Sequence, residues 1–61
     1  MLDDILRKAG MTHAIWHWID GRWESDGAGK EVVVRELVEE ANKQGRRAIM
    51  REIGQDPNTE K

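Results

Sequence analysis

Two histidines, His13 and His17, stand four positions apart and are the most obvious candidates for chemistry in this sequence. On a helix, that spacing brings two imidazoles to one metal ion. On a strand, it separates them by about 13 Å, which is too far to share an ion. The chain has no cysteine and no other histidine to complete a site. We therefore expect no metal centre and no cofactor.

The sequence offers few candidate nucleophiles for catalysis, because the chain contains one serine, no cysteine and no tyrosine. On a strand, Ser25 lies opposite Trp16 while His17 points to the other face, so no base is positioned to activate the hydroxyl. The acidic residues are scattered along predicted helix faces that are exposed to solvent. We predict no catalytic residues and expect that the protein is not an enzyme.

The segment Gly27-Ala28-Gly29-Lys30 precedes a predicted helix, and helix N-termini favour anions. A phosphate-binding P-loop also needs a glycine five residues before Gly29 and a serine or threonine after Lys30. Glu24 and Glu31 occupy those two positions. The composition of residues 26–29 therefore predicts a plain flexible loop.

Four cations, Lys43, Arg46, Arg47 and Arg51, fall within nine positions and are the best indication of nucleic-acid binding. Such a cluster can meet phosphates, and an exposed tryptophan can stack on bases. Acidic residues are interleaved with the cluster, and the formal net charge of −2 provides no overall attraction to nucleic acid or to anionic membranes. Nucleic-acid binding is therefore the alternative hypothesis.

The same region resembles two DNA-binding classes in part. The pattern Ala41-x-x-x-Gly45 is similar to the first helix and turn of helix-turn-helix proteins, but Gln44 and Arg51 stand where those proteins carry apolar residues. The tripeptide Gln44-Gly45-Arg46 is similar to the turn of ribbon-helix-helix repressors, but residues 26–30 are not an alternating strand. The chain is assigned to neither family.

The stretch Ala14 to Ser25 predicts a β-hairpin, because Asp20-Gly21 is typical of a two-residue type I′ turn. A helix across these residues would have no apolar stripe, and Trp and Ile favour strands. The turn predicts the pairs Ile19–Arg22, Trp18–Trp23, His17–Glu24 and Trp16–Ser25. Strand alternation places Ala14, Trp16, Trp18 and Trp23 on one face and Ile15, His17, Ile19, Arg22 and Glu24 on the other.

Two segments show helical periodicity. Leu2 to Ala9 predicts a short helix that ends at Gly10. Lys30 to Gln44 predicts the main helix, which ends at Gly45. Its buried stripe is expected to consist of Val34, Leu37, Val38 and Ala41.

Residues 46–53 suit either a third strand or a short terminal helix. The strand is favoured, because an isolated hairpin is only marginally stable. It places Ala48 and Met50 on one face and Ile49, Arg51 and Ile53 on the other. Residues 55–61 have nothing to bury and predict a disordered C-terminal tail. The expected fold is therefore a single small α+β domain over residues 1–54.

A chain of 61 residues without cysteine has no disulfide and buries only about 60% of its unfolded surface. A partner chain or self-association is therefore expected to contribute to its stability. No apolar run is long enough for a signal peptide or a membrane span, and the start, Met1-Leu2-Asp3-Asp4, is acidic. We expect a cytoplasmic protein without membrane contact.

Both faces of the predicted hairpin carry large apolar side chains, and the main helix is expected to cover the tryptophan face. The opposite face, with Ile15, His17, Ile19 and Arg22, is then a candidate protein-binding surface. The edge of the small sheet is a second candidate. The leading hypothesis is a non-enzymatic protein-interaction or regulatory module, either self-associating or a subunit or inhibitor of a larger partner. The alternative is a small nucleic-acid-binding regulator.

Overall fold

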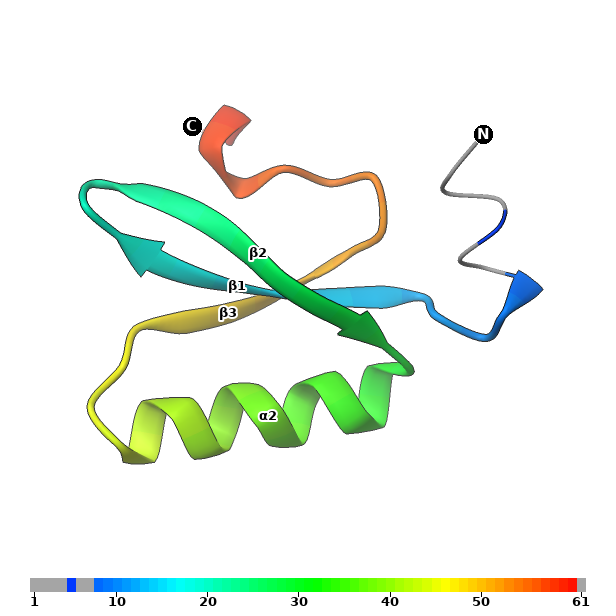
Figure 1. The fold of residues 1–61 in the computed structure, drawn as a ribbon, viewed down its shortest axis with the longest axis horizontal. Coiled ribbons are helices and arrows are strands. Elements are labelled where there is room, and N and C mark those ends of the chain that lie inside the picture. Colours follow the sequence, from blue (N-terminus) through cyan, green and yellow to red (C-terminus); the bar gives the residue numbers. More distant parts are fainter. Residues whose placement is uncertain (1–4, 6–7, 61) are drawn as a thin grey trace.

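The computed structural model describes residue 5 and residues 8–60 of the chain. Its elements are β1 (His13–Ile19), β2 (Arg22–Gly29), α2 (Glu31–Lys43), β3 (Ala48–Glu52) and the 3₁₀ turn η1 (Pro57–Thr59). The strands form one antiparallel sheet in the order β2-β1-β3. Helix α2 lies on one face of this sheet and the C-terminal segment lies on the other (Figure 1). This architecture confirms the predicted α+β class and the predicted order of hairpin, helix and third strand.

The β1–β2 hairpin has the predicted turn and register. Asp20 and Gly21 have positive φ angles of 53° and 82°, as a type I′ turn requires. All four predicted cross-strand pairs occur. The rings of Trp18 and Trp23 lie 5.0 Å apart at 71°, an edge-to-face arrangement that aromatic pairs favour.

Strand β2 continues beyond Ser25 to Gly29, so the predicted loop over residues 26–29 is wrong. The register shifts between Ile15 and Trp16, because Trp16 pairs with Ser25 while Ile15 pairs with Gly27. Asp26 is therefore the extra residue of a β-bulge. The glycine-rich composition marks this bulge and the close packing next to it rather than the end of the strand.

The main core lies between α2 and the face of the sheet that carries Ile15. Ile15, Val34, Ala41 and Ala48 form its buried cluster, and Val38 and Met50 pack against this cluster. The prediction that the helix covers the tryptophan face is therefore wrong. Strands β2 and β3 are both antiparallel to β1 and so run parallel to each other. A crossover between parallel strands is right-handed, and with β3 beside β1 this handedness places the helix on the Ile15 face (Figure 1).

Helix α2 ends at the predicted glycine. Gly45 has a φ of 82°, which glycine adopts readily. The Arg46 backbone N–H donates to the Ala41 carbonyl at 2.9 Å, and the Gly45 N–H donates to the Asn42 carbonyl at 3.1 Å. These two bonds form a Schellman motif, which ends the helix and directs the chain into β3. Strand β3 confirms the strand interpretation of this segment, with Ala48 and Met50 on the core side.

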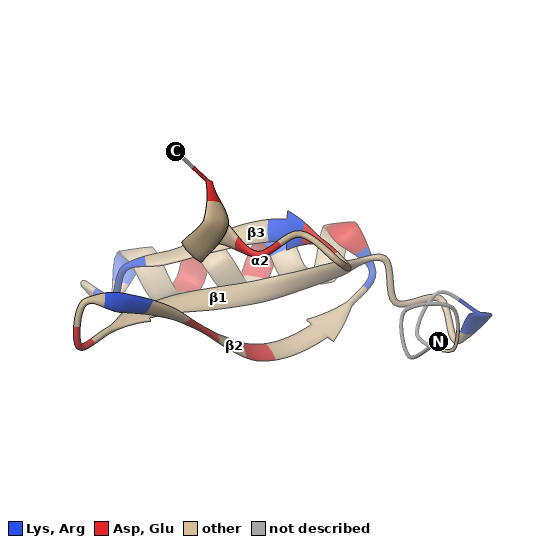
Figure 2. Cartoon of the chain, turned by 90° about the horizontal axis from the view of Figure 1, so that it is seen from above, with Lys and Arg blue, Asp and Glu red and all other residues tan. Residues whose placement is uncertain are grey.

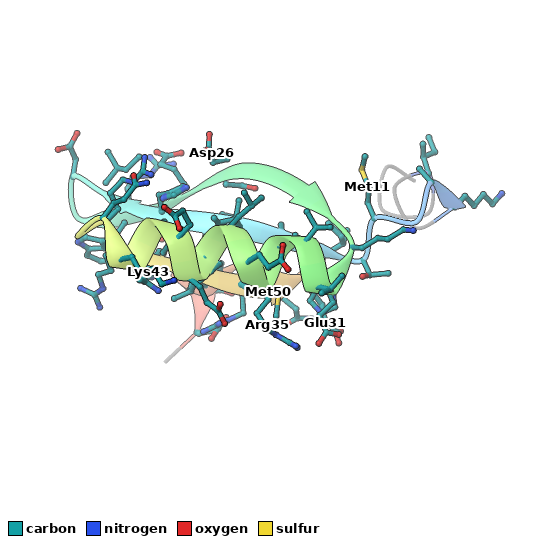
Figure 3. All side chains as sticks on the ribbon, turned by 90° about the horizontal axis from the view of Figure 1, so that it is seen from below. Met11, Asp26, Glu31, Arg35, Lys43 and Met50 are labelled. Atoms are coloured by element: carbon teal, nitrogen blue, oxygen red, sulfur yellow. The ribbon has the colours of Figure 1, made fainter. Side chains whose placement is uncertain are left out.

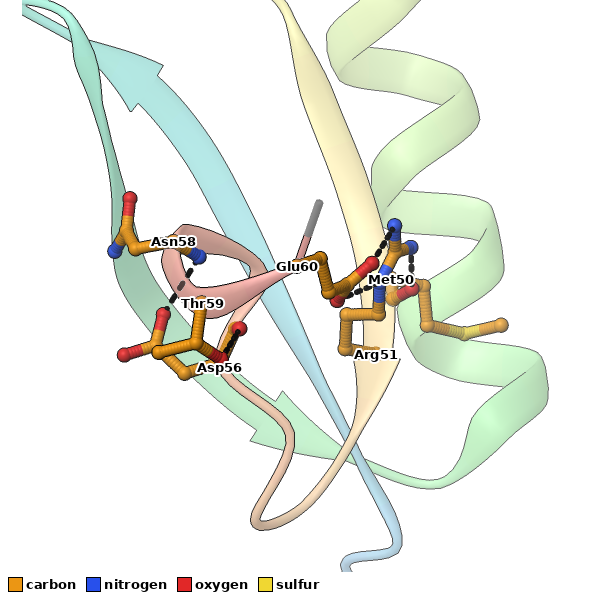
Figure 4. A network of polar contacts seen from close by, with 6 residues as sticks. All are labelled: Met50, Arg51, Asp56, Asn58, Thr59 and Glu60. Carbon is orange, nitrogen blue, oxygen red and sulfur yellow. Dashed lines mark hydrogen bonds and ion pairs between the residues drawn. The ribbon is translucent and has the colours of Figure 1, made fainter.

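The C-terminal segment packs against the sheet, where the sequence predicts a disordered tail. Pro57 is buried, and the Asn58 side chain bonds both backbone polar groups of Trp23. Arg51 on β3 donates two hydrogen bonds to Glu60 (Figure 4). The segment thus covers part of the tryptophan face that α2 leaves open. Of the predicted helix at residues 2–9, residues 2–4 and 6–7 lie outside the described part, and the Ala9 N–H donates to the Ile5 carbonyl at 3.2 Å.

The ion pair between Arg51 and Glu60 makes the docking of this segment sensitive to pH. The hydrogen bonds from Arg51 lower the pKa of Glu60, while the nearby Asp56 acts in the opposite direction. A lowered folded-state pKa stabilises the docked segment above the unfolded pKa of Glu60, and this contribution is lost as pH falls through the folded pKa. We expect Glu60→Gln to abolish this acid-side loss, measured as the pH dependence of the urea midpoint. The loss is expected to be small because both side chains are exposed, and an unchanged pH profile in the variant would show that the pair does not contribute to stability.

Candidate functional site

Large apolar side chains remain exposed outside this small core. Ile19 is 49% exposed at the end of β1, and Leu37 is 51% exposed on α2. Leu37 belongs to the predicted buried stripe of the helix, and that assignment is wrong for this residue. The helix turns Val34, Val38 and Ala41 towards the sheet, which leaves Leu37 at its flank.

The helix-side face of the sheet is hollowed beside Ile19 and Leu37. Helix α2 packs mainly on β1 and β3, and Figure 3 shows Asp26 of β2 to one side of the helix. A hollow of about 260 Å³ lies between α2 and β2, with Ile15 and Leu37 among its lining residues. A second hollow of about 320 Å³ continues to Ile19. We call the two hollows together the helix-side groove.

The two hollows share three polar residues, His17, Asp26 and Arg46, so they adjoin each other. His17 Nε2 lies 3.4 Å from an Asp26 carboxylate oxygen, an ion pair whenever the imidazole is protonated. The Arg46 guanidinium donates to the Gln44 side-chain oxygen at 2.6 Å. The groove therefore has an apolar floor and sides with polar groups of both charges, a combination typical of binding clefts.

The predicted protein-binding residues lie in or next to this groove. Ile15 is 6% exposed and belongs to the core, so it forms the floor and is not free to present itself to a partner. His17 and Ile19 line the groove. Arg22 lies in β2 beside the turn, where it pairs with Glu24 at 3.0 Å. Sequence reasoning missed Leu37 and Asp26, because it assigned the first to the core and the second to a loop.

The predicted basic cluster is divided by the fold. Arg46 and Arg47 line the groove next to Ile19, and Lys43 ends α2 just before them. Figure 2 shows the blue segments of the α2–β3 connection at the same end of the molecule as the β1–β2 turn. Arg51 is separate from these residues, because it lies on the other face of the sheet and pairs with Glu60.

Arg47 contacts the aromatic pair of Trp18 and Trp23. Its guanidinium carbon lies 4.9 Å from the ring centroid of Trp18 and 5.4 Å from that of Trp23. These distances are within the range of cation–π attraction. The arginine therefore covers ring surface that the alternative hypothesis assigns to stacking on bases.

The two histidines have different acidic neighbours. His13 Nε2 lies 3.9 Å from Glu31, at the start of α2, whereas His17 faces Asp26 on β2. Within residue 5 and residues 8–60, no group of three or more His, Cys, Asp or Glu side chains is arranged to hold a metal ion. In the same residues, no helix is long and apolar enough to cross a membrane.

No known protein-family model, curated protein or solved structure matches this chain. Any functional proposal must therefore come from the groove and the surfaces around it.

Proposed function

We propose that this chain is a non-enzymatic module that binds a protein partner through the helix-side groove. The observation that carries the proposal is the position of Ile19 and Leu37, each about half exposed, beside a groove with an apolar floor. Exposed apolar side chains gathered at a hollow are typical of protein interfaces. The polar groups His17, Asp26 and Arg46 would orient the bound segment. As part of the same proposal, the module acts in the cytoplasm.

The partner is identified by recovery of proteins from native lysate with the tagged chain, with and without nuclease. Its affinity for the purified chain is then measured by calorimetry. We expect Ile19→Lys and Leu37→Lys each to weaken binding at least 10-fold, because apolar anchors at interface centres contribute more than 1 kcal/mol. Both side chains are half exposed, so far-ultraviolet circular dichroism should remain that of the parent.

The matched control is Val32→Lys. Val32 is 59% exposed on the same helix but lines neither hollow of the groove. This variant should bind as the parent does. Equal losses for Val32→Lys and Leu37→Lys, or no loss for Leu37→Lys, would contradict the groove as the binding surface.

The second candidate function is nucleic-acid binding by Lys43, Arg46 and Arg47. It is favoured by their position near one end of the molecule, where Arg46 and Arg47 line one hollow and Lys43 ends α2 just before them. Recovery that collapses on nuclease treatment, with an affinity that falls steeply as salt rises, would support this candidate over the first. Arg51 is omitted from this site because it pairs with Glu60.

A further inference from the structure

The two free edges of the sheet are protected in different ways. On β3, the Ala48 N–H donates to the Asn42 side-chain oxygen at 3.2 Å, and the Asn42 amide reaches the Ala48 carbonyl at 3.5 Å. The Met50 carbonyl accepts from the Arg51 guanidinium at 2.8 Å, and the Glu52 carbonyl accepts from a turn N–H at 3.0 Å. Each outward carbonyl of β3, together with the Ala48 N–H, therefore already has a partner, which disfavours pairing of this edge with another strand.

On β2, the protection rests on one side chain. Trp23 lies opposite Trp18 in a non-hydrogen-bonded pair, so its backbone N–H and carbonyl point away from β1. The Trp23 N–H donates to the Asn58 side-chain oxygen at 2.8 Å, and the Asn58 amide donates to the Trp23 carbonyl at 2.9 Å. The carboxamide thus takes the place that a neighbouring strand would occupy. Within the described residues, no hydrogen bond reaches the outward groups of Ser25, the next such residue.

Asn58 is held in this position by the turn that carries it. Its backbone N–H donates to the Asp56 side chain at 2.8 Å, and the Thr59 hydroxyl donates to the Asp56 carbonyl at 2.8 Å. Figure 4 shows this turn beside β2, with Glu60 directed to Arg51 on β3. The hydrogen bonds of this segment are exposed, and Pro57 is the only buried residue among residues 55–60, so the turn can leave β2 at a lower cost than unfolding of the sheet.

We infer that the β2 edge pairs with the β2 edge of a second copy of this chain, and that Asn58 must leave Trp23 before pairing occurs. Antiparallel pairing of Trp23 with Trp23 of the second copy uses the backbone groups that Asn58 occupies. In that register, Arg22 lies opposite Glu24 of the second copy, and Glu24 lies opposite its Arg22. Opposite charges directly across a strand pair are stabilising. The pairing is self-complementary, as a two-fold interface requires.

The charges also explain why a docked Asn58 prevents pairing. With Trp23 occupied, the first free outward residue is Ser25. If Ser25 pairs with Ser25 of the second copy, Glu24 lies opposite Asp26 of that copy, and Asp26 lies opposite its Glu24. Like charges directly opposite each other are destabilising. Asn58 therefore blocks the register with opposite charges, and the register about the next free residue, Ser25, is unfavourable.

The test is sedimentation equilibrium of the full chain and its Asn58→Ala variant. We expect Asn58→Ala to dimerise with a constant at least 10-fold tighter than that of the parent chain. The matched control is Asn42→Ala, which removes the same amide from the other edge and should remain as monomeric as the parent. Equal association of the parent and Asn58→Ala, or of the two variants, would overturn the inference.

Charge variants then test the register. In the Asn58→Ala background, Arg22→Glu places acids opposite acids and Glu24→Arg places cations opposite cations, so each should be monomeric alone. An equal mixture of the two should form a heterodimer. Homodimers of either variant, or a mixture that stays monomeric, would overturn the register. If circular dichroism shows that Asn58→Ala is unfolded, Arg22→Glu and Glu24→Arg are compared in the otherwise unaltered chain at high concentration. Each variant is again expected to be monomeric alone, and the mixture is expected to form a heterodimer.

This pairing does not depend on the apolar anchors of the proposed groove. It uses the backbone of β2 with Arg22 and Glu24. Glu24 also lines the groove, but partner binding is carried by Ile19 and Leu37. Leu37→Lys should therefore leave the dimerisation constant of Asn58→Ala unchanged while it weakens partner binding.

Discussion

Ile15→Ala is expected to leave most of the protein unfolded at room temperature. Ile15 is 6% exposed and contacts the buried cluster of Val34, Ala41 and Ala48 beneath α2. Truncation of a buried isoleucine to alanine costs about 2–5 kcal/mol, which includes the cavity that remains. A single core in a domain of this size supplies no more than about 3–5 kcal/mol. Urea unfolding followed by tryptophan fluorescence measures the loss.

Ile19→Ala is the matched control for this variant. It removes the same atoms from the same strand, but Ile19 is half exposed and lies in the groove. Surface changes of this kind alter stability by about 0.5 kcal/mol or less. A parent-like urea midpoint for Ile15→Ala would mean that α2 does not cover this face of the sheet. The same result would restore Ile15 as a candidate binding residue.

A chain that ends at Gly54 is expected to lose about 2–3 kcal/mol of unfolding free energy. It lacks the two hydrogen bonds between Asn58 and Trp23, which contribute about 1 kcal/mol each. It also lacks the buried ring of Pro57, for which about 25 cal/mol per Å² of apolar surface gives on the order of 1 kcal/mol. Removal of this cover should shift tryptophan emission to longer wavelength, because solvent reaches the tryptophan face.

A chain that ends at Thr59 is the control for this truncation. It keeps Pro57 and Asn58 and lacks the Arg51–Glu60 pair. Exposed ion pairs contribute little, so its urea midpoint should lie close to that of the full chain. Both truncated chains are compared at low micromolar concentration, so that pairing through β2 does not add to their stability. Equal stability of the full chain and the chain that ends at Gly54 would mean that residues 55–61 are the disordered tail that their composition predicts.

The two proposals assign different tasks to the two sides of β2. In these proposals, the helix-side groove binds a partner through exposed apolar side chains, whereas the outer edge pairs with a second copy only when Asn58 is displaced. The edge lies outside the small core between α2 and the sheet, and the groove borders this core, with Ile15 as its floor. So short a chain buries only a small apolar core, which leaves apolar side chains available for surfaces of this kind.

The sequence by itself determined the local structure of this protein. The Asp20-Gly21 turn dictated the register of the hairpin, because both central residues of a type I′ turn need positive φ. The apolar periodicity and Gly45 likewise defined α2 and its end. Residues 46–53 suit either a strand or a helix, and the strand is favoured because the hairpin needs a third strand. The turn and the helix depend on contacts between near neighbours in the chain, which local composition describes well.

Only the tertiary structure decided which face of the sheet became the core. The hairpin carries apolar side chains on both faces, so periodicity does not distinguish them. The choice follows from the pairing of β3 with β1 and from the right-handed crossover, which together place α2 over Ile15. The same pairing exposed Leu37, and it brought the C-terminal segment to the tryptophan face, where Asn58 meets Trp23 across 35 positions of sequence. A contact over that separation depends on the whole topology, and no local pattern in residues 55–61 indicates it.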